Sequence, residues 1–268
     1  MYPVIHITDQ FQIPLYALCF FVGFLLAVIF AMKTAQKQGM DKFDLLYAAL
    51  YAAIGIGVGA KVFFFLSRLP KILIHFDTYK EMIKVNPGAA LNYAFGGLVF
   101  YGGLFGAVLG VYIYCKHFKV PIMPIISIFT PLIPFVHGFG RIGCFFAGCC
   151  YGIPYSGPFA IQFPYNVQSP QLSLVPRFPV QLLEALLNFI FAAILFYLRK
   201  KKSFSAPKLL GSYFLYYAIA RFFLEYVRGD LERGKYRYFS TSQLISVLLL
   251  PIAIYLNFYG KNKKRKSE

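Results

Sequence analysis

Seven long apolar runs alternate with short polar segments along this chain. Each run is close to 20 residues, which is long enough for a helix to cross roughly 30 Å of hydrocarbon. The predicted spans are residues 13–32, 45–66, 93–114, 122–139, 180–198, 209–227 and 241–258. The pattern predicts an all-α polytopic membrane protein, a single transmembrane domain over residues 1–268 with about seven transmembrane helices.

Two segments between the runs are too polar to span. Residues 68–92 mix charged and apolar side chains, which is typical of an interfacial amphipathic arm, and a plain solvated loop is the alternative. Residues 141–178 include a part rich in Pro, Gln, Ser and aromatic residues, and we expect a small head at the outer face. Four prolines in and before the fourth span predict that its helix is kinked.

Composition supports the membrane assignment. Hydrophobic residues make up 59% of the chain and charged residues only 14%, against about 25% in a soluble domain. The net charge of +17 does not indicate a nucleic-acid partner, because Lys and Arg gather at the ends of apolar runs. Of the 27 Lys and Arg residues, 15 follow the first, third and fifth spans or lie in the C-terminal tail. This positive-inside pattern predicts an outer N-terminus and a cytoplasmic C-terminus.

The cysteines follow neither a secretory nor a structural-metal pattern. Five cysteines, two of them within predicted spans, do not suggest a disulfide framework, and no cleavable signal peptide is expected. Residues 137–152, HGFGRIGCFFAGCCYG, hold three of them. Their glycines predict a stretch too flexible for an ordinary helix interior. Close helix packing is the alternative for the glycines, but it does not explain Arg141.

Two arginines are candidates for binding an anion. Arg221 lies inside an apolar run, where a charge is costly, and Arg141 has no obvious acidic partner in the sequence. Guanidinium groups match phosphate oxygens bidentately, so the pair could clamp a phosphate. The alternative for Arg221 is an ion pair with Glu225, one helical turn later. Gln181 and Glu184 share a helix face, and Glu184 could pair with an arginine or act as a base.

The thiols leave several readings open. Cys144, Cys149 and Cys150 with His137 could ligate a metal, but CxxxxCC lacks the paired CxxC spacing of a structural zinc site, so no metal site is predicted. A Cys–His nucleophile pair or oxidation of Cys149 with Cys150 is also possible. Tyr16, Tyr101 and Tyr151 are phenols near predicted outer helix ends, where aromatic-belt residues are common.

Several motifs resemble one family along essentially the whole chain. They are IPLYALCFFVGF (13–24), GGLVFYGG (96–103), PVQLLEA (179–185), ARFFLEYVRGD (220–230) and STSQLIS (240–246). The chain resembles the prolipoprotein diacylglyceryl transferases, bacterial inner-membrane enzymes with seven spans and a small outer head. The family signature Gly-Arg-x-Gly-Asn-Phe-x-Asn-x-Glu-x-x-Gly aligns without gaps on Gly140–Gly152.

The resemblance includes matches and departures. Positions that match the family pattern are Tyr16, Arg141, Gly143, Phe145, Gly152 and Arg221. Positions that depart are Cys144 and Ala147 for Asn, Cys149 for Glu, Tyr101 and Phe178 for His, and Ser127 for Asp. The resemblance therefore implies a divergent branch, which keeps both phosphate-binding arginines and replaces polar residues by thiols.

By this resemblance the chain transfers a diacylglyceryl group from phosphatidylglycerol to the lipobox cysteine of a prolipoprotein. The candidate catalytic residues are Arg141 and Arg221, which match the family, with Tyr101 as a candidate base and Cys144 and Cys149 at positions that depart from it. The implied substrate-binding residues are Tyr16, Gly102, Arg141, Gly143, Gln181, Glu184 and Arg221.

The expected partners are phosphatidylglycerol or another anionic phospholipid, the prolipoprotein signal peptide and membrane lipids, with no cofactor. The expected location is the bacterial cytoplasmic membrane, with the active site toward the outer face. Two alternatives stay open. One is a lipid or acyl transferase with Cys144 or Cys149 as nucleophile and His137 as base, and the other is a non-enzymatic thiol-lined binding or transport protein.

Overall fold

The computed structural model describes residues 4–8, 11–164, 173–201, 203–229, 235–236 and 239–265. Most of these residues are helical, and the strands form only two small antiparallel ribbons. Four helical segments of the described chain are long and apolar enough to cross a membrane, and residues 242–258 form a shorter apolar helix. The four are Leu15–Lys37, Lys42–Ile74, Ile122–Ala147 and Val180–Arg199. The predicted class, an all-α polytopic membrane protein, is confirmed, while the number of seven crossings stays a prediction.

Contacts divide the chain into two compact units, and each is described by itself. The first unit comprises residues 1–30 and 123–268, and the second comprises residues 31–122. Helices of the first unit are the start of α1 (Leu15–Lys37), α6 (Ile122–Phe129) from Met123, α7 (Leu132–Ala147), α8 (Val180–Arg199), α9 (Ala206–Leu224), the 3-10 turn η2 (Glu225–Val227) and α10 (Thr241–Arg265). Its strands are β1 (Val4–Thr8), β2 (Phe11–Pro14), β3 (Lys235–Tyr236) and β4 (Phe239–Ser240). Strand β2 occupies the first residues of the predicted first span, so α1 begins at Leu15.

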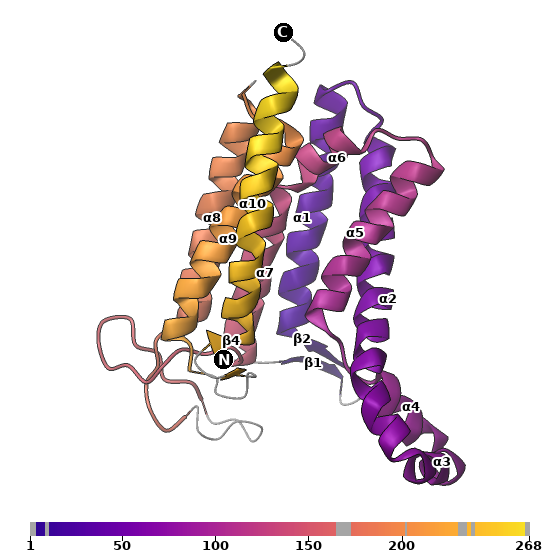
Figure 1. The fold of residues 1–268 in the computed structure, drawn as a ribbon. Coiled ribbons are helices and arrows are strands. Elements are labelled where there is room, and N and C mark those ends of the chain that lie inside the picture. The colour runs from indigo at the N-terminus through magenta and orange to yellow at the C-terminus, as the bar shows by residue number, and fades with distance from the viewer. Residues whose placement is uncertain are drawn as a thin grey trace. The chain divides into compact units, whose positions relative to one another are not determined.

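Helices α7, α8, α9 and α10 pack in sequence order (Figure 1). Leu195 on α8 and Leu209 and Tyr213 on α9 are buried together. Phe191 stacks on Tyr216 with ring centroids 3.9 Å apart. This apolar contact fixes the register of α8 against α9, and the polar residues nearer the start of α8 and the end of α9 lie on the same interface.

The proline-rich fourth span is interrupted, as predicted. Helix α6 ends at Phe129, and α7 begins after Pro131, whose ring allows a helix start but not a helix interior. The prediction that the glycines break the following stretch is wrong, because α7 continues to Ala147. The predicted start of the head at residue 141 is therefore also displaced, and the non-helical segment begins at Gly148.

Close packing explains why two of the three glycines of α7 lie in a helix. A Cβ on Gly138 would fall 2.6 Å from the ring of Phe189 on α8, and one on Gly143 would fall 3.0 Å from the Tyr16 Cα on α1. The helix therefore tolerates the cost of each glycine, about 1 kcal/mol, because α1 and α8 approach α7 more closely than a side chain permits.

The segment after α7 is tied to the end of α9 by backbone hydrogen bonds. The Ile153 N–H donates to the Val227 carbonyl, and the Gly229 N–H donates to the Tyr151 carbonyl. Gly152 and Arg228 form an antiparallel bridge. These bonds bring the end of the cysteine stretch beside residues 227–229, which are about 75 positions away in the sequence.

The second unit contains α2 (Lys42–Ile74), α3 (Phe76–Val85), α4 (Pro87–Phe95) and α5 (Phe100–His117), and the end of α1 from Ala31. Helices α2 and α5 lie side by side (Figure 1). Gly55 faces Gly106, and Gly59 faces Gly102, so closely that a Cβ on any of the four would meet backbone atoms of the facing helix. This is the small-residue packing that brings membrane helices together.

Two predicted bounds in this unit differ from the structure. Residues 68–74 of the predicted arm continue α2 instead of leaving it, because the Arg68 guanidinium lies over the rings of Phe64 and Tyr93 at 5.2 and 5.4 Å. The helix at the predicted third span, α5, begins at Phe100 and not at residue 93, because Gly96 and Gly97 follow the end of α4. The position of the arm at a membrane interface stays a prediction.

Candidate functional site

A buried carboxylate lies at the centre of the polar residues between α7, α8 and α9. Glu184 is in the second turn of α8, and its side chain is 3% exposed. Its Oε1 lies 3.0 Å from Arg141 Nε and 3.5 Å from His137 Nε2, and its Oε2 lies 3.8 Å from Arg228 Nη1. Of the two roles predicted for Glu184, the structure shows the ion pair. An ionised carboxylate this deep needs such partners to offset its desolvation.

The two Nη nitrogens of Arg141 form no hydrogen bond with the residues that the structure describes. No acidic partner for Arg141 was obvious in the sequence, and the structure shows that Glu184 reaches it from α8, 43 positions away. Arg141 Nε also lies 3.2 Å from His137 Nε2, one turn earlier on α7. Both contacts use Nε, and within the described part of the chain no residue accepts a hydrogen bond from either Nη nitrogen. The fork that matches phosphate oxygens is therefore available to a ligand.

Arg221 is held from two sides on α9. Its Nη2 lies 2.8 Å from Glu225 Oε2 and donates to Ser242 Oγ on α10 at 2.9 Å. The predicted i,i+4 ion pair is therefore present. Nη1 is buried and has no hydrogen-bond partner among the described residues. A buried donor without a partner costs about 1–3 kcal/mol. An anionic ligand that accepts a hydrogen bond from Nη1 would remove this cost.

Arg228 is a site residue that the sequence did not reveal. In the sequence it belongs to a polar, mixed-charge segment, RGDLERGKYR, that follows the sixth apolar run. In the structure the bridge with Gly152 turns it inward, and its side chain is 2% exposed beside Glu184. Two signals were available: its place one residue after a predicted span, and its position within the family-like motif ARFFLEYVRGD (220–230).

The three thiols of the cysteine stretch gather at the end of α7. The sulfurs of Cys144, Cys149 and Cys150 all lie within 4.8 Å of one another. Gly148 and Cys150 both have left-handed backbone conformations, with φ of +67° and +59°, which turn the chain back on Cys144. Gln181 Nε2 donates to the Cys149 carbonyl at 2.9 Å and so joins α8 to this turn. The shared face predicted for Gln181 and Glu184 is confirmed, since both are buried.

The remaining predicted residues fall in two groups. Tyr16 lies in the first turn of α1, where its backbone packs against Gly143 on α7. Tyr101 and Gly102 lie in the first turn of α5, in the second unit, where Gly102 packs against Gly59. Their predicted roles as base and substrate contact stay predictions.

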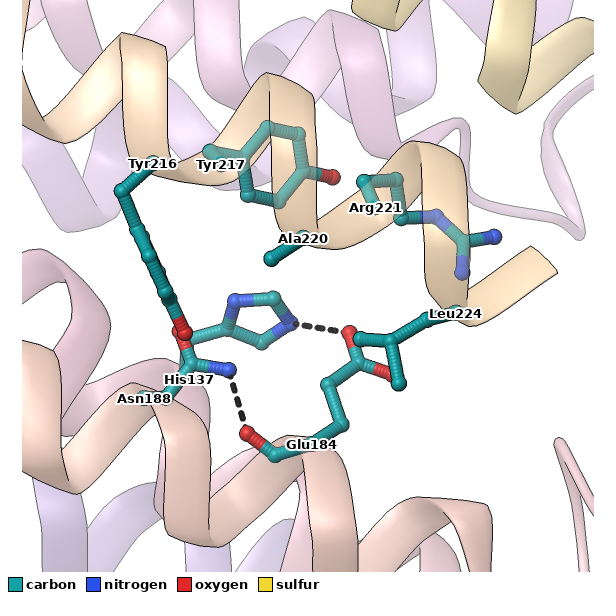
Figure 2. Close-up of a pocket in the computed structure, with 8 residues that line it drawn as sticks. All are labelled: His137, Glu184, Asn188, Tyr216, Tyr217, Ala220, Arg221 and Leu224. Atoms are coloured by element: carbon teal, nitrogen blue, oxygen red, sulfur yellow. Dashed lines mark hydrogen bonds and ion pairs between the residues drawn. The ribbon is translucent and has the colours of Figure 1, made fainter. Parts of the chain in front are cut away.

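A small pocket opens beside Glu184. Figure 2 shows His137 from α7 and Glu184 and Asn188 from α8 facing the α9 residues that complete its wall. These are Tyr216, Tyr217, Ala220, Arg221 and Leu224. Asn188 donates to the Glu184 carbonyl at 2.8 Å, which stiffens the first turns of α8 (Figure 2).

The ion cluster carries surplus positive charge. Among the residues that the structure describes, the three arginines Arg141, Arg221 and Arg228 face two carboxylates, Glu184 and Glu225, so these five side chains together carry a net charge of about +1 with His137 neutral. In a region with little water, that excess favours one bound anion. A phosphodiester with a single negative charge would neutralise it.

Comparison with known proteins agrees with this chemistry. The family model for prolipoprotein diacylglyceryl transferase matches residues 3–259. The chain is similar to proteins named phosphatidylglycerol–prolipoprotein diacylglyceryl transferase from several bacteria. The Clostridium tetani protein is 29% identical over 256 residues, which is 96% of each chain. The Rickettsia bellii (strain OSU 85-389) protein is 30% identical over 261 residues, 95% of this chain and 93% of its own length. The chain belongs to the prolipoprotein diacylglyceryl transferase family.

Proposed function

We propose that this membrane protein transfers the diacylglyceryl group of phosphatidylglycerol to the lipobox cysteine thiol of prolipoproteins. Family membership over residues 3–259 and the activity for which the relatives are named support the reaction. The observation that carries the proposal is the free guanidinium fork of Arg141 in a cluster with one excess positive charge.

Arg141 is the phosphate ligand in this proposal. Glu184 and His137 both contact Nε, so the side chain is oriented before any substrate arrives. Its two Nη nitrogens then donate to phosphate oxygens. Because they are positioned in advance, they stabilise the charge that grows on the leaving phosphate without reorganising in the transition state.

Arg221 and Arg228 set the potential of the site. Arg221 is anchored by Glu225 and Ser242 and offers Nη1 to the ligand. Arg228 lies on the far side of the Glu184 carboxylate from Arg141, bound to its other oxygen. Three arginines face two carboxylates, so one positive charge is in excess. This excess attracts the anionic head group without breaking the existing ion pairs.

The reaction forms one bond and breaks another. The acceptor sulfur attacks the glyceryl carbon as a thiolate, and the carbon–oxygen bond to the phosphate breaks. The phosphate oxygen keeps the electron pair, and glycerol phosphate leaves. The thiol proton needs an acceptor, and Tyr101, which stands where the family has His, is the candidate base.

The contacts of His137 favour this reaction over a cysteine nucleophile activated by histidine. His137 Nε2 lies 3.2 Å from Arg141 Nε and 3.5 Å from Glu184 Oε1, so this nitrogen is engaged within the ion cluster. His137 is therefore a positioning residue for Arg141.

Location and access complete the proposal. The protein lies in the bacterial cytoplasmic membrane, with its N-terminus outside and its C-terminus in the cytoplasm. The substrate lipid diffuses in sideways from the outer leaflet, and the signal peptide of the prolipoprotein presents its cysteine at the same face.

Complementation tests the function. A strain depleted of its own diacylglyceryl transferase is expected to grow when it expresses this chain, and a lipobox peptide should gain the mass of one diacylglyceryl group. The Arg141→Ala variant should lose both outcomes, while Arg68→Ala, a change near the end of α2, should keep them. No rescue by a stably inserted wild-type chain would reject the proposed function.

A further inference from the structure

The cysteine cluster has the geometry of a metal site. Thiolate sulfurs around a tetrahedral Zn²⁺ lie about 2.3 Å from the ion, which places them about 3.8 Å from one another. Cys144, Cys149 and Cys150 already have all three sulfur separations within 4.8 Å. Closure onto an ion requires movements of about 1 Å or less, which thiol side chains can supply by rotation. A disulfide requires a much shorter distance, about 2.05 Å.

The backbone adopts an unfavourable conformation that brings the three cysteines together. Cys150 has a φ of +59°, a conformation that costs a non-glycine residue about 1–2 kcal/mol. The Cys149 N–H donates to the Cys144 carbonyl at 3.1 Å, and the Gly229 N–H donates to the Tyr151 carbonyl. Gln181 holds the Cys149 carbonyl from α8. Three elements therefore hold the two neighbouring cysteines over Cys144.

The exposure of the three cysteines also suits a metal site. Cys144 is buried, Cys150 is partly buried and Cys149 is exposed, so one side of the cluster is open. Three protein ligands with an open fourth position are the pattern of catalytic zinc, whereas structural zinc has four protein ligands.

We propose that Cys144, Cys149 and Cys150 bind one Zn²⁺ ion, whose open position takes the acceptor thiol as a thiolate. This second step rests on the proposed function. Arg141 is three residues before Cys144 on α7, so the phosphate fork and the thiols lie on neighbouring parts of one helix face. The thiol that attacks and the phosphate that leaves would thus be held side by side.

The chemistry balances without a redox step. The acceptor thiol replaces a water molecule on the ion and loses its proton to solvent. Its sulfur then forms the bond to the glyceryl carbon while the carbon–oxygen bond to the phosphate breaks. The thioether product is a weak zinc ligand, so it leaves and water returns. Bound in this way, the acceptor thiol is deprotonated at neutral pH without a side-chain base.

Metal binding is measured first, independently of activity. The chain is purified in detergent under reducing conditions, loaded with Zn²⁺ or Co²⁺ alone, and analysed for metal content and absorption. We expect about one ion per chain, and thiolate-to-cobalt charge-transfer bands in the Co²⁺ form. Cys144→Ser and Cys149→Ser should each weaken Zn²⁺ binding at least 100-fold, because even outer-shell changes cost about 10–100-fold. Cys115→Ala, a cysteine of α5, is the matched control and should bind normally.

Acceptor binding is measured second. A short lipobox peptide added to the Co²⁺ form should shift the charge-transfer bands, and the same peptide with serine in place of cysteine should not. Absence of metal, binding that survives both serine variants, or recovery of the cluster as a disulfide overturns the proposal. Transferase activity that survives complete metal removal overturns the catalytic role and leaves the proposed function standing. Metal and peptide binding without transfer would instead reject the proposed function.

Discussion

Replacing Glu184 by Gln is expected to destabilise the protein far more than the length of its ion pair suggests. The amide keeps the shape of the side chain but removes the charge that Arg141 and Arg228 face at 3.0 and 3.8 Å. At an effective dielectric constant of about 20, the first contact alone corresponds to about 5.5 kcal/mol of Coulomb attraction. Desolvation of the buried charges offsets part of this attraction in the native protein. When Glu184 loses its charge, the arginines remain buried, so their desolvation cost remains without the attraction that balanced it. We therefore expect a loss of about 3–5 kcal/mol.

The chain provides a matched control. Glu81 and Lys84 on α3 form a shorter contact, 2.8 Å, but both side chains are 65% exposed. Water and ions screen this pair, so Glu81→Gln should cost less than about 0.5 kcal/mol. The difference in stability loss between the two variants should follow the burial of the ion pair and not the distance between its charges.

The assay is thermal unfolding of the detergent-solubilised protein, measured as loss of the monodisperse chromatographic peak. Tyrosine absorbance serves as the signal, because the chain has 21 Tyr and no Trp. At about 2–4 °C per kcal/mol for a larger domain, Glu184→Gln should lower the midpoint by about 6–20 °C and Glu81→Gln by under 2 °C. Equal shifts in the two variants would refute the assignment of a tightly coupled buried cluster.

Three further changes test the packing and the anion site. Gly59→Ala should destabilise α2 against α5, because its Cβ would meet the Gly102 carbonyl, whereas Gly57→Ala has open space and should be neutral or slightly stabilising in the same thermal assay. Arg141→Lys keeps the charge but loses the fork, so kcat/KM for lipid should fall about 10–100-fold with little change in midpoint, and an unchanged value would argue against bidentate binding. Ser242→Ala removes the acceptor that holds Arg221 Nη2 and should cost about 1 kcal/mol of stability, with restoration by Ser242→Thr as the check.

Local sequence patterns predicted most of the helices and failed where a distant partner decides the conformation. The apolar runs located α1, α2, α8 and α10, because crossing hydrocarbon requires long apolar helices whatever their neighbours are. The glycines of residues 137–152 predicted a broken helix. In the structure Phe189 and Tyr16 approach so closely that glycine is needed within a continuous α7.

The same distinction between local pattern and distant contact applies to the candidate site. The sequence by itself determined that this is a membrane protein with arginines where charge is costly, and that its motifs resemble one family, because composition and residue order carry that information. Only the tertiary structure decided that Glu184 holds Arg141 and Arg228, and that three cysteine sulfurs meet at the end of α7. Those contacts depend on how α7, α8 and the segment after α9 pack together. Ion pairs and thiol contacts between separate elements act over a few ångströms in space and leave no fixed spacing in the chain.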